Sequence, residues 1–256
     1  MSTLSICIAG ITGWTGSALA EAVAAADDLE LRSGVSRSAA GGEAHGAPIH
    51  ATVGEALDGV DVLIDYTSHD AVKTNALTAI ERGVAVVIGT SGLTAADFAE
   101  LDQAARTRGV GVIASGNFSV TAAMMQAAAL LAAKHIPSWE VIDYARAGKA
   151  DAPSGTAREL AEKLGGAHAE RSIEETSGVR EARGGTIGGT QVHSLRLPSF
   201  TVSTEVVFGL PDERLSIRHD AGSSAAPYVA GTLLAARAAP TTVGVVRGLA
   251  TLLLQN

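Results

Sequence analysis

Two segments of this sequence combine residue types that bind negatively charged groups, and each precedes a predicted helix. The first is Gly10-Ile-Thr-Gly13-Trp-Thr-Gly16. Its glycines permit a tight turn and let the backbone approach a pyrophosphate, whose charge the free N–H groups of a helix N-terminus stabilise. A purely structural turn is the alternative. Because the segment joins a predicted buried strand, Leu4 to Ala9, to a predicted helix, Ser17 to Ala26, we expect a dinucleotide site that also includes Thr12, Trp14 and Thr15.

The end of the next predicted strand, Leu29 to Val35, bears on the choice of nucleotide. An NAD site usually has an acidic residue there, which accepts a hydrogen bond from the ribose 2′-hydroxyl. This sequence instead has Ser36-Arg37-Ser38. A guanidinium flanked by two hydroxyls suits a 2′-phosphate, so the segment favours NADPH, with NADH possible; a solvated loop arginine is the alternative.

Two later predicted strands also end in small polar residues. These ends are Asp65-Tyr66-Thr67 and Gly89-Thr90-Ser91-Gly92. Ligands of an open parallel sheet bind at the carboxyl ends of its strands. We therefore expect both segments to line the nicotinamide half of the site.

The second anion-binding segment is Lys149-Ala-Asp151-Ala-Pro153-Ser154-Gly155-Thr156. Pro and Ser near a helix start, followed by Gly and Thr with exposed amides, form a cradle for an anion. Lys149 adds a compact charge and a transferable proton, and Asp151 would orient the loop or the lysine. An ordinary capped helix start is the alternative, but it explains only Pro153 and Ser154.

The elements that must position these segments alternate between strand and helix through the first half of the chain. This alternation predicts βαβ crossovers and a parallel sheet, in an α/β Rossmann-type domain of residues 1–118. The expected elements after a polar, Gly-rich loop through Gly46 are strands Val60 to Tyr66, Val84 to Ile88 and Val110 to Ala114, and helices Asp70 to Arg82 and Ala95 to Arg108.

The pattern changes after residue 118, and we expect a second α/β domain over residues 119–224 with a mostly antiparallel sheet. The C-terminal segment, residues 225–256, is expected to return to the first domain as two apolar helices, Ala226 to Ala238 and Val243 to Leu254. The elements expected in the second domain are helices Val120 to His135 and Gly155 to Leu164, a long polar loop from Gly165 to Gly189, and strands Trp139 to Tyr144, Gln191 to Leu197, Ser203 to Phe208 and Leu215 to His219.

Composition excludes several other kinds of protein. The formal net charge of −8 argues against a surface for nucleic acid or anionic membranes, which reward clustered Lys and Arg. The single cysteine, Cys7, allows no intrachain disulfide, and the seven histidines lack the clustered spacing of a metal site, so we expect no metal. We expect a cytoplasmic protein without a signal peptide or membrane span.

The motifs together resemble the 4-hydroxy-tetrahydrodipicolinate (dihydrodipicolinate) reductases of bacterial lysine biosynthesis. The resemblance spans nearly the whole chain and implies a Rossmann-type domain, a second domain whose sheet mediates a homotetramer, and hydride transfer from NAD(P)H to a cyclic unsaturated dicarboxylate. It is carried by the glycine segment, Asp65-Tyr-Thr67, Gly89-Thr-Ser91-Gly92, Ser115-Gly-Asn117-Phe118-Ser119, Lys149 to Thr156, and Val192-His-Ser-Leu-Arg196.

The resemblance also implies roles for individual residues. Lys149, Ser154, Gly155 and Thr156 would hold a substrate carboxylate and the surroundings of the reacting nitrogen. The nicotinamide would meet Ser91, which also borders the substrate, and the hinge residues Ser115, Asn117 and Phe118.

This sequence departs from the family pattern at the expected acid–base group. Family members usually carry a His-His pair upstream of the lysine, where this chain has Ala145 and Arg146, and a Val-Gly-Glu-His stretch is here Val202-Ser-Thr204. Losing a positioned general acid costs roughly 10²–10⁴-fold in rate. Our hypothesis is that Lys149 supplies the proton, that Tyr144 assists, and that Arg146 forms a second carboxylate clamp, as guanidinium geometry allows. A packed strand aromatic is the alternative for Tyr144.

Two other functions compete with this interpretation. One is a divergent imine reductase or dehydrogenase that acts on a different imino acid, and the other is a non-catalytic NADPH-sensing protein. Retention of the segment from Lys149 to Thr156 favours an enzyme, because a sensor has no need of a second anion cradle.

Overall fold

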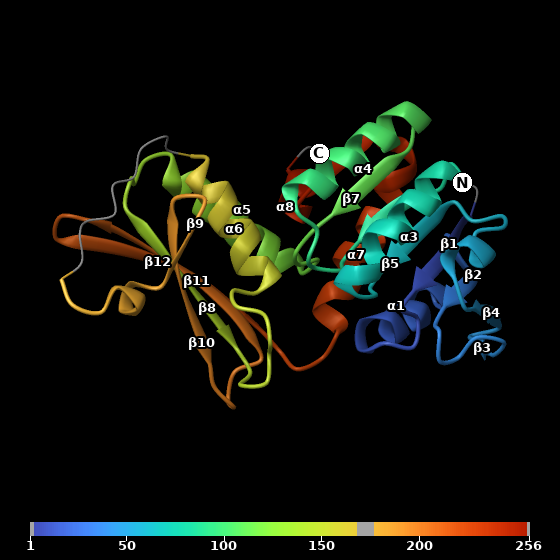
Figure 1. The fold of residues 1–256 in the computed structure, drawn as a ribbon, viewed down its shortest axis with the longest axis horizontal. Coiled ribbons are helices and arrows are strands. Elements are labelled where there is room, and N and C mark those ends of the chain that lie inside the picture. The colour runs from blue at the N-terminus through green and yellow to red at the C-terminus, as the bar shows by residue number, and fades with distance from the viewer. Residues whose placement is uncertain (1–2, 168–176, 255–256) are drawn as a thin grey trace. The chain divides into compact units, whose positions relative to one another are not determined.

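The computed structural model describes residues 3–167 and 177–254, which form two compact units, Met1–Val120 with Ala225–Asn256 and Thr121–Ser224. The sequence predicts domain borders at 118/119 and 224/225. Figure 1 shows the two units, each built around its own sheet.

The first unit contains an eight-stranded sheet in the order β13-β7-β6-β5-β1-β2-β4-β3. All neighbouring strands are parallel except β3 and β4. Every residue of β5, β6 and β7 is buried, as expected for a parallel sheet covered on both faces. The strands are β1 (Leu4–Ala9), β2 (Leu29–Val35), β3 (Glu43–Ala44), β4 (Ala47–His50), β5 (Val62–Asp65), β6 (Ala85–Ile88), β7 (Gly111–Ala114) and β13 (Gly244–Arg247).

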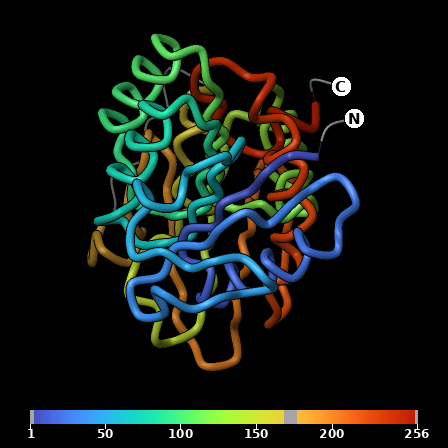
Figure 2. The backbone as a smooth tube through the Cα atoms, turned by 90° about the vertical axis from the view of Figure 1, so that its right-hand side faces the viewer, coloured from blue at the N-terminus to red at the C-terminus, as the bar shows by residue number. Residues whose placement is uncertain are grey.

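Helices pack against this sheet, and the C-terminal segment contributes two of them, α7 and α8. Helix α7 packs beside α1, and Arg237 of α7 forms a bidentate ion pair with Asp28, which precedes β2. Figure 2 shows the blue N-terminal and red C-terminal segments side by side. The helices of this unit are α1 (Trp14–Ala24), α2 (Val53–Ala56), α3 (His69–Glu81), α4 (Ala95–Arg108), α7 (Ala226–Ala238) and α8 (Leu249–Leu253).

Two sequence-based expectations about this unit are wrong. The predicted helix from Val243 to Leu254 begins instead as strand β13, which pairs with β7, and only α8 is helical. The β-branched Val245 and Val246 extend the edge of the sheet, and Gly248 at φ +88° separates the strand from the helix. The predicted loop through Gly46 also contains β3, which forms a hairpin with β4.

The second unit contains a five-stranded sheet in the order β12-β11-β8-β10-β9. Strands β8 and β10 are parallel and the other neighbours are antiparallel, so the mostly antiparallel sheet is confirmed. The elements are β8 (Trp139–Ala145), β9 (Gly185–Ile187), β10 (Thr190–Arg196), β11 (Val202–Leu210), β12 (Glu213–Ala221), α5 (Val120–Ala133), α6 (Gly155–Gly165) and a 3-10 helix (Arg180–Arg183); the 3-10 helix Ala239–Thr241 belongs to the first unit.

Both α-helices described in this unit pack on one face of its sheet. Ala129 and Ala133 of α5 and Leu160 and Leu164 of α6 join a buried cluster with Trp139, Val141, Val206 and Phe208 of the sheet. The predicted loop from Gly165 to Gly189 lies partly outside the described residues, at 168–176, and elsewhere contains the 3-10 helix and β9. No helix in the described part of the chain is long and apolar enough to cross a membrane.

Candidate functional site

The glycine segment forms a tight turn from β1 into α1 where no side chain fits. Gly10 has φ +84°, and a Cβ atom there would lie 2.2 Å from the Tyr66 carbonyl oxygen. A Cβ atom on Gly16 would lie 2.0 Å from the Gly10 carbonyl oxygen. Gly13 is the N-cap of α1 and offers no capping side chain, and no described residue accepts from the Trp14, Thr15 or Gly16 amides. This turn therefore fits a pyrophosphate.

The residues after β2 lie against this turn. The Oγ1 atom of Thr12 is 2.9 Å from the Oγ atom of Ser36, which is 3.3 Å from that of Ser38. Arg37 is exposed and forms no ion pair within the described ranges. A free guanidinium thus stands beside two hydroxyls at the end of β2, as a 2′-phosphate site requires.

A buried carboxylate, Asp65, ties together the ends of β5 and β6. Its Oδ1 atom accepts hydrogen bonds from the Thr67 amide and hydroxyl and from the Thr90 hydroxyl, and its Oδ2 atom accepts one from the Asn75 side chain. The hydroxyls of Thr67 and Thr90 are therefore oriented by Asp65. The sequence signal was a lone Asp at the end of an apolar strand, but the contribution of Asn75 was missed.

The ring of Tyr66 packs directly over Gly89. A Cβ atom on Gly89 would lie 2.2 Å from the Cζ atom of Tyr66, and the Tyr66 hydroxyl hydrogen-bonds with Thr232 of α7 at 2.8 Å. Burial raises the pKa of this hydroxyl above its ordinary value. Tyr66 therefore presents its backbone to the glycine turn, while its side chain attaches α7 to the sheet.

Polar groups and a buried ring also follow β7. The Ser115 hydroxyl donates to the Asn117 carbonyl at 2.8 Å, and the Asn117 side chain accepts from the Ser119 amide at 2.8 Å. Phe118 is fully buried, with its ring 6.4 Å from that of Tyr66, whereas Ser91 after β6 is exposed. The strand ends of the first unit thus bring together the residues that the sequence assigned to a nucleotide.

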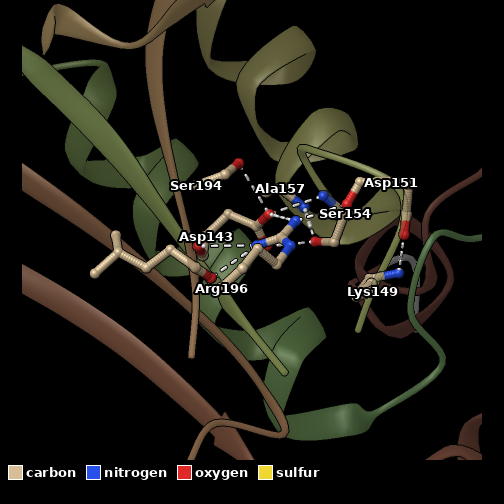
Figure 3. A network of polar contacts seen from close by, with 8 residues as sticks. Asp143, Lys149, Asp151, Ser154, Ala157, Ser194 and Arg196 are labelled. Atoms are coloured by element: carbon tan, nitrogen blue, oxygen red, sulfur yellow. Dashed lines mark hydrogen bonds and ion pairs between the residues drawn. The ribbon is translucent and has the colours of Figure 1, made fainter. Parts of the chain in front are cut away.

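In the second unit the centre of the candidate site is a carboxylate, Asp143, that sequence reasoning missed. Asp143 lies on β8 and is fully buried. It accepts hydrogen bonds from the Ser154 amide at 2.9 Å, the Ser154 hydroxyl at 2.7 Å, the Ser194 hydroxyl at 3.2 Å and the Arg196 Nη2 atom at 2.8 Å. Figure 3 shows the contacts that join Asp143 to Ser154 and to Arg196.

Ser154 caps α6 and is itself held by Asp143. Its hydroxyl donates to Asp143 and accepts from the Ala157 amide at 3.3 Å, so both of its bonding roles are filled inside the protein. The Gly155 amide donates to no described acceptor. The part of the cradle that faces a ligand is therefore the backbone of the first turn of α6.

Two contacts of Asp151, one through its carboxylate and one through its carbonyl, hold the loop before α6. The Lys149 Nζ atom lies 2.5 Å from Oδ1 of Asp151, and the Asp151 carbonyl accepts from Nη2 of Arg196 at 2.7 Å. The Lys149 side chain is 27 % exposed. Lys149 therefore presents a positive charge near the α6 N-terminus, as expected for a site that binds a carboxylate.

Tyr144 and Arg146 lie away from Asp143. Side chains alternate along β8, so Tyr144 projects from the face opposite Asp143. There its hydroxyl donates to Glu205, and its ring packs at a tilt against Phe200 and lies under the Arg218 guanidinium. Burial and the Glu205 carboxylate raise the pKa of Tyr144. Ala145 is buried and Arg146 is exposed beyond the end of the strand. The roles of Tyr144 and Arg146 stay predictions.

Comparisons with known proteins match both units of the chain. Residues 4–118 match the family model described as dihydrodipicolinate reductase, N-terminus, and residues 118–253 match its C-terminus. A 4-hydroxy-tetrahydrodipicolinate reductase from Moorella thermoacetica is 35% identical over 99% of both chains. One from Syntrophomonas wolfei is 36% identical over 84% of this chain and 86% of its own.

A solved structure has the same fold. The dipicolinate-bound dihydrodipicolinate reductase from Paenisporosarcina sp. TG-14 superposes with a TM-score of 0.78 at 24% identity, covering 97% of this chain and 99% of that chain. The fold and the two anion-binding turns define a nicotinamide-nucleotide-dependent oxidoreductase. The chain belongs to the dihydrodipicolinate reductase family, which confirms the resemblance inferred from its motifs.

Proposed function

We propose that this protein transfers a hydride from NADPH to a cyclic imine or enamine that carries two carboxylates, of the kind named for its relatives in lysine biosynthesis. The observation that carries the proposal is the arrangement around α6. The free first-turn amide of Gly155 and the Lys149 ammonium belong to one short segment, and Asp143 fixes the start of the helix. That arrangement suits a carboxylate beside a group that needs a proton.

The first unit would hold the nucleotide at the turn from Gly10 to Gly16, with Thr67, Thr90, Ser115 and Asn117 along the nicotinamide half. The nucleotide, when bound, supplies the hydride. The close approach of Gly10 and Gly16 to backbone carbonyls supports this assignment, because a side chain at either position would occupy the turn.

In the second unit we assign the amides of Gly155 and Thr156 to one substrate carboxylate, and Lys149 to the proton. Negative charge develops on the substrate as the hydride adds, and an ammonium proton held at Nζ neutralises it. Arg146 would clamp the second carboxylate, since its exposed guanidinium can bind one in a bidentate fashion. Tyr144 donates to Glu205 on the opposite face of β8, so the proton is assigned first to Lys149, and assistance by Tyr144 stays a prediction.

NADPH is the nucleotide that the end of β2 favours. Arg37 is exposed beside Ser36 and Ser38, and no acidic residue stands there to accept from a ribose hydroxyl. The expected preference is therefore for NADPH, with NADH as a weaker hydride donor.

We further propose a cytoplasmic homotetramer assembled through the second unit's sheet. Its helices pack on one face, and the opposite face carries Ile142, Tyr144, His193 and Glu205. Light scattering should give four times the 25.8 kDa chain mass. Ile142→Arg should lower that mass, whereas Val243→Arg, on the first unit, should not; an unchanged mass for Ile142→Arg would contradict this interface.

The deciding experiment is NADPH oxidation measured against a panel of cyclic and linear imines. Oxidation with the cyclic dicarboxylate supports the proposal. Oxidation only with another imino acid would favour the divergent reductase. Nucleotide binding without any turnover would favour the sensor, and failure to bind NADPH or NADH would remove the proposal altogether.

A further inference from the structure

The carboxylate of Asp143 has an environment that a merely structural strand residue would not need. It is fully buried between the sheet and α6, and four donors occupy its two oxygens. A buried carboxylate is costly unless it is paired and hydrogen-bonded, so this group persists only because its partners surround it. Those partners come from two places in the chain, the start of α6 and strand β10, and Arg196 of β10 also donates to the loop before α6.

Arg196 extends this arrangement to Lys149. A single nitrogen, Nη2, donates both to Asp143 and to the Asp151 carbonyl, and the Asp151 carboxylate pairs with Lys149. The guanidinium is mostly buried, with its side chain 16 % exposed. Two arms therefore leave Asp143, one to the cap of α6 through Ser154 and one to the lysine loop through Arg196.

The two arms end at the two groups that the proposed function assigns to the substrate. The Ser154 arm sets the direction of the first-turn amides of α6. The Arg196 arm sets the position of the residue whose side chain holds Lys149. Neither Asp143 nor Ser154 presents a donor to a ligand, because both are buried and the Ser154 hydroxyl proton is committed to Asp143.

We infer that Asp143 and Arg196 are positioning residues that hold the α6 amides and the Lys149 loop in one fixed geometry for a dicarboxylate. The inference rests on the proposed function, and it adds that affinity for the carboxylate ligand depends on two side chains that never touch it. Displacement of a binding group by about 1 Å can cost on the order of 100-fold, so loss of either arm should be visible in substrate binding.

The test compares Asp143→Asn and Arg196→Lys with the wild-type enzyme. Asp143→Asn keeps an acceptor for Ser154 and loses the ion pair. Arg196→Lys keeps the charge but loses the planar guanidinium, whose Nη1 atom also donates to the Asp143 and Leu195 carbonyls. We expect the KM for the cyclic imine to rise and the affinity for dipicolinate, measured by calorimetry, to fall by about 10- to 100-fold. The Kd for NADPH should not change, and kcat should change less than KM.

Glu140→Gln is the matched control, since it makes the same chemical exchange on the same strand. Glu140 lies on the opposite face of β8 and pairs with His193 and Arg183. Asp143→Asn and Arg196→Lys combined should raise the KM no further than Asp143→Asn alone. The reason is that both substitutions break the same contact, the ion pair between Asp143 and Arg196. Far-UV circular dichroism and thermal unfolding show whether each variant folds. If Asp143→Asn does not fold, the KM and the dipicolinate affinity are measured on Arg196→Lys, which keeps the charge.

The outcomes separate the inference from the proposed function. A folded Asp143→Asn or Arg196→Lys enzyme with wild-type KM and dipicolinate affinity overturns the inference and leaves the function standing. A wild-type protein that binds dipicolinate but reduces no imine overturns the function, and the calorimetry still decides the inference. A wild-type protein that does neither overturns both.

Discussion

The Nζ atom of Lys149 lies 2.5 Å from the Oδ1 atom of Asp151, two residues further along the same loop. A substrate carboxylate that binds Lys149 must therefore share the ammonium with an internal carboxylate. That sharing keeps Lys149 in place before the substrate arrives, and the lysine still has accessible surface for a second partner.

Lys149→Met should abolish turnover, with a loss of at least about 10²–10⁴-fold in kcat, because no other ammonium is assigned to the developing charge. NADPH affinity, measured by fluorescence titration, should be unchanged. Lys134→Met is the control, since Lys134 is exposed near the end of α5. Retained turnover in Lys149→Met would end the assignment of the proton to this residue.

Gly16→Ala should weaken nucleotide binding by about tenfold or more and cost about 1–3 kcal/mol of stability, as overpacking does. The new methyl group would lie 2.0 Å from the Gly10 carbonyl oxygen and would force the turn apart. Gly54→Ala is the matched control: Gly54 lies in α2, and a Cβ atom there meets nothing closer than 3.9 Å. Thermal unfolding and NADPH titration of both variants check the prediction; equal NADPH affinity in the two would refute it.

Arg37→Ala should raise the Kd for NADPH and leave the Kd for NADH nearly unchanged. A hydrogen bond to a charged group contributes about 1.5–3 kcal/mol, which corresponds to roughly 10- to 150-fold in Kd. Arg32→Ala is the control, since Arg32 lies on β2 and pairs with Glu30. If Arg37→Ala affects the two nucleotides equally, the guanidinium does not read a 2′-phosphate.

The stability of the protein should fall as the pH drops below the ordinary histidine pKa of about 6.5, partly because of His219. Burial lowers the pKa of His219, against a smaller opposing effect of Asp220. The unfolded chain then binds the proton more readily than the folded one, so stability rises with pH across this window and is lost as pH falls through the unfolded value.

His219→Gln should flatten this part of the pH profile, measured as the free energy of unfolding in denaturant between about pH 5 and 7. His135→Gln is the control, because His135 is exposed. An identical slope in wild type and His219→Gln would show that the ring is not responsible.

The sequence by itself determined the family and the parallel sheet of the first unit, and it predicted the two segments that we assign to anions. These features are local. The glycine spacing, the alternation of apolar strands with helices and the Pro-Ser-Gly-Thr helix start each act within a few residues, so the order of residues reveals them. The β-hairpin of β3 with β4 was missed because its strands are short. Strand β13 was missed because its conformation depends on pairing with β7, which is distant along the chain.

Only the tertiary structure decided how the segments are held. Asp143, Ser194 and Arg196 meet because β8 and β10 are parallel neighbours, although about fifty residues separate them along the chain. Only the assembled unit likewise shows which face of β8 packs against the helices, and Tyr144 lies on the opposite face. A buried carboxylate takes its partners from whatever the fold brings within hydrogen-bond distance, so its role appears only when the strands are assembled.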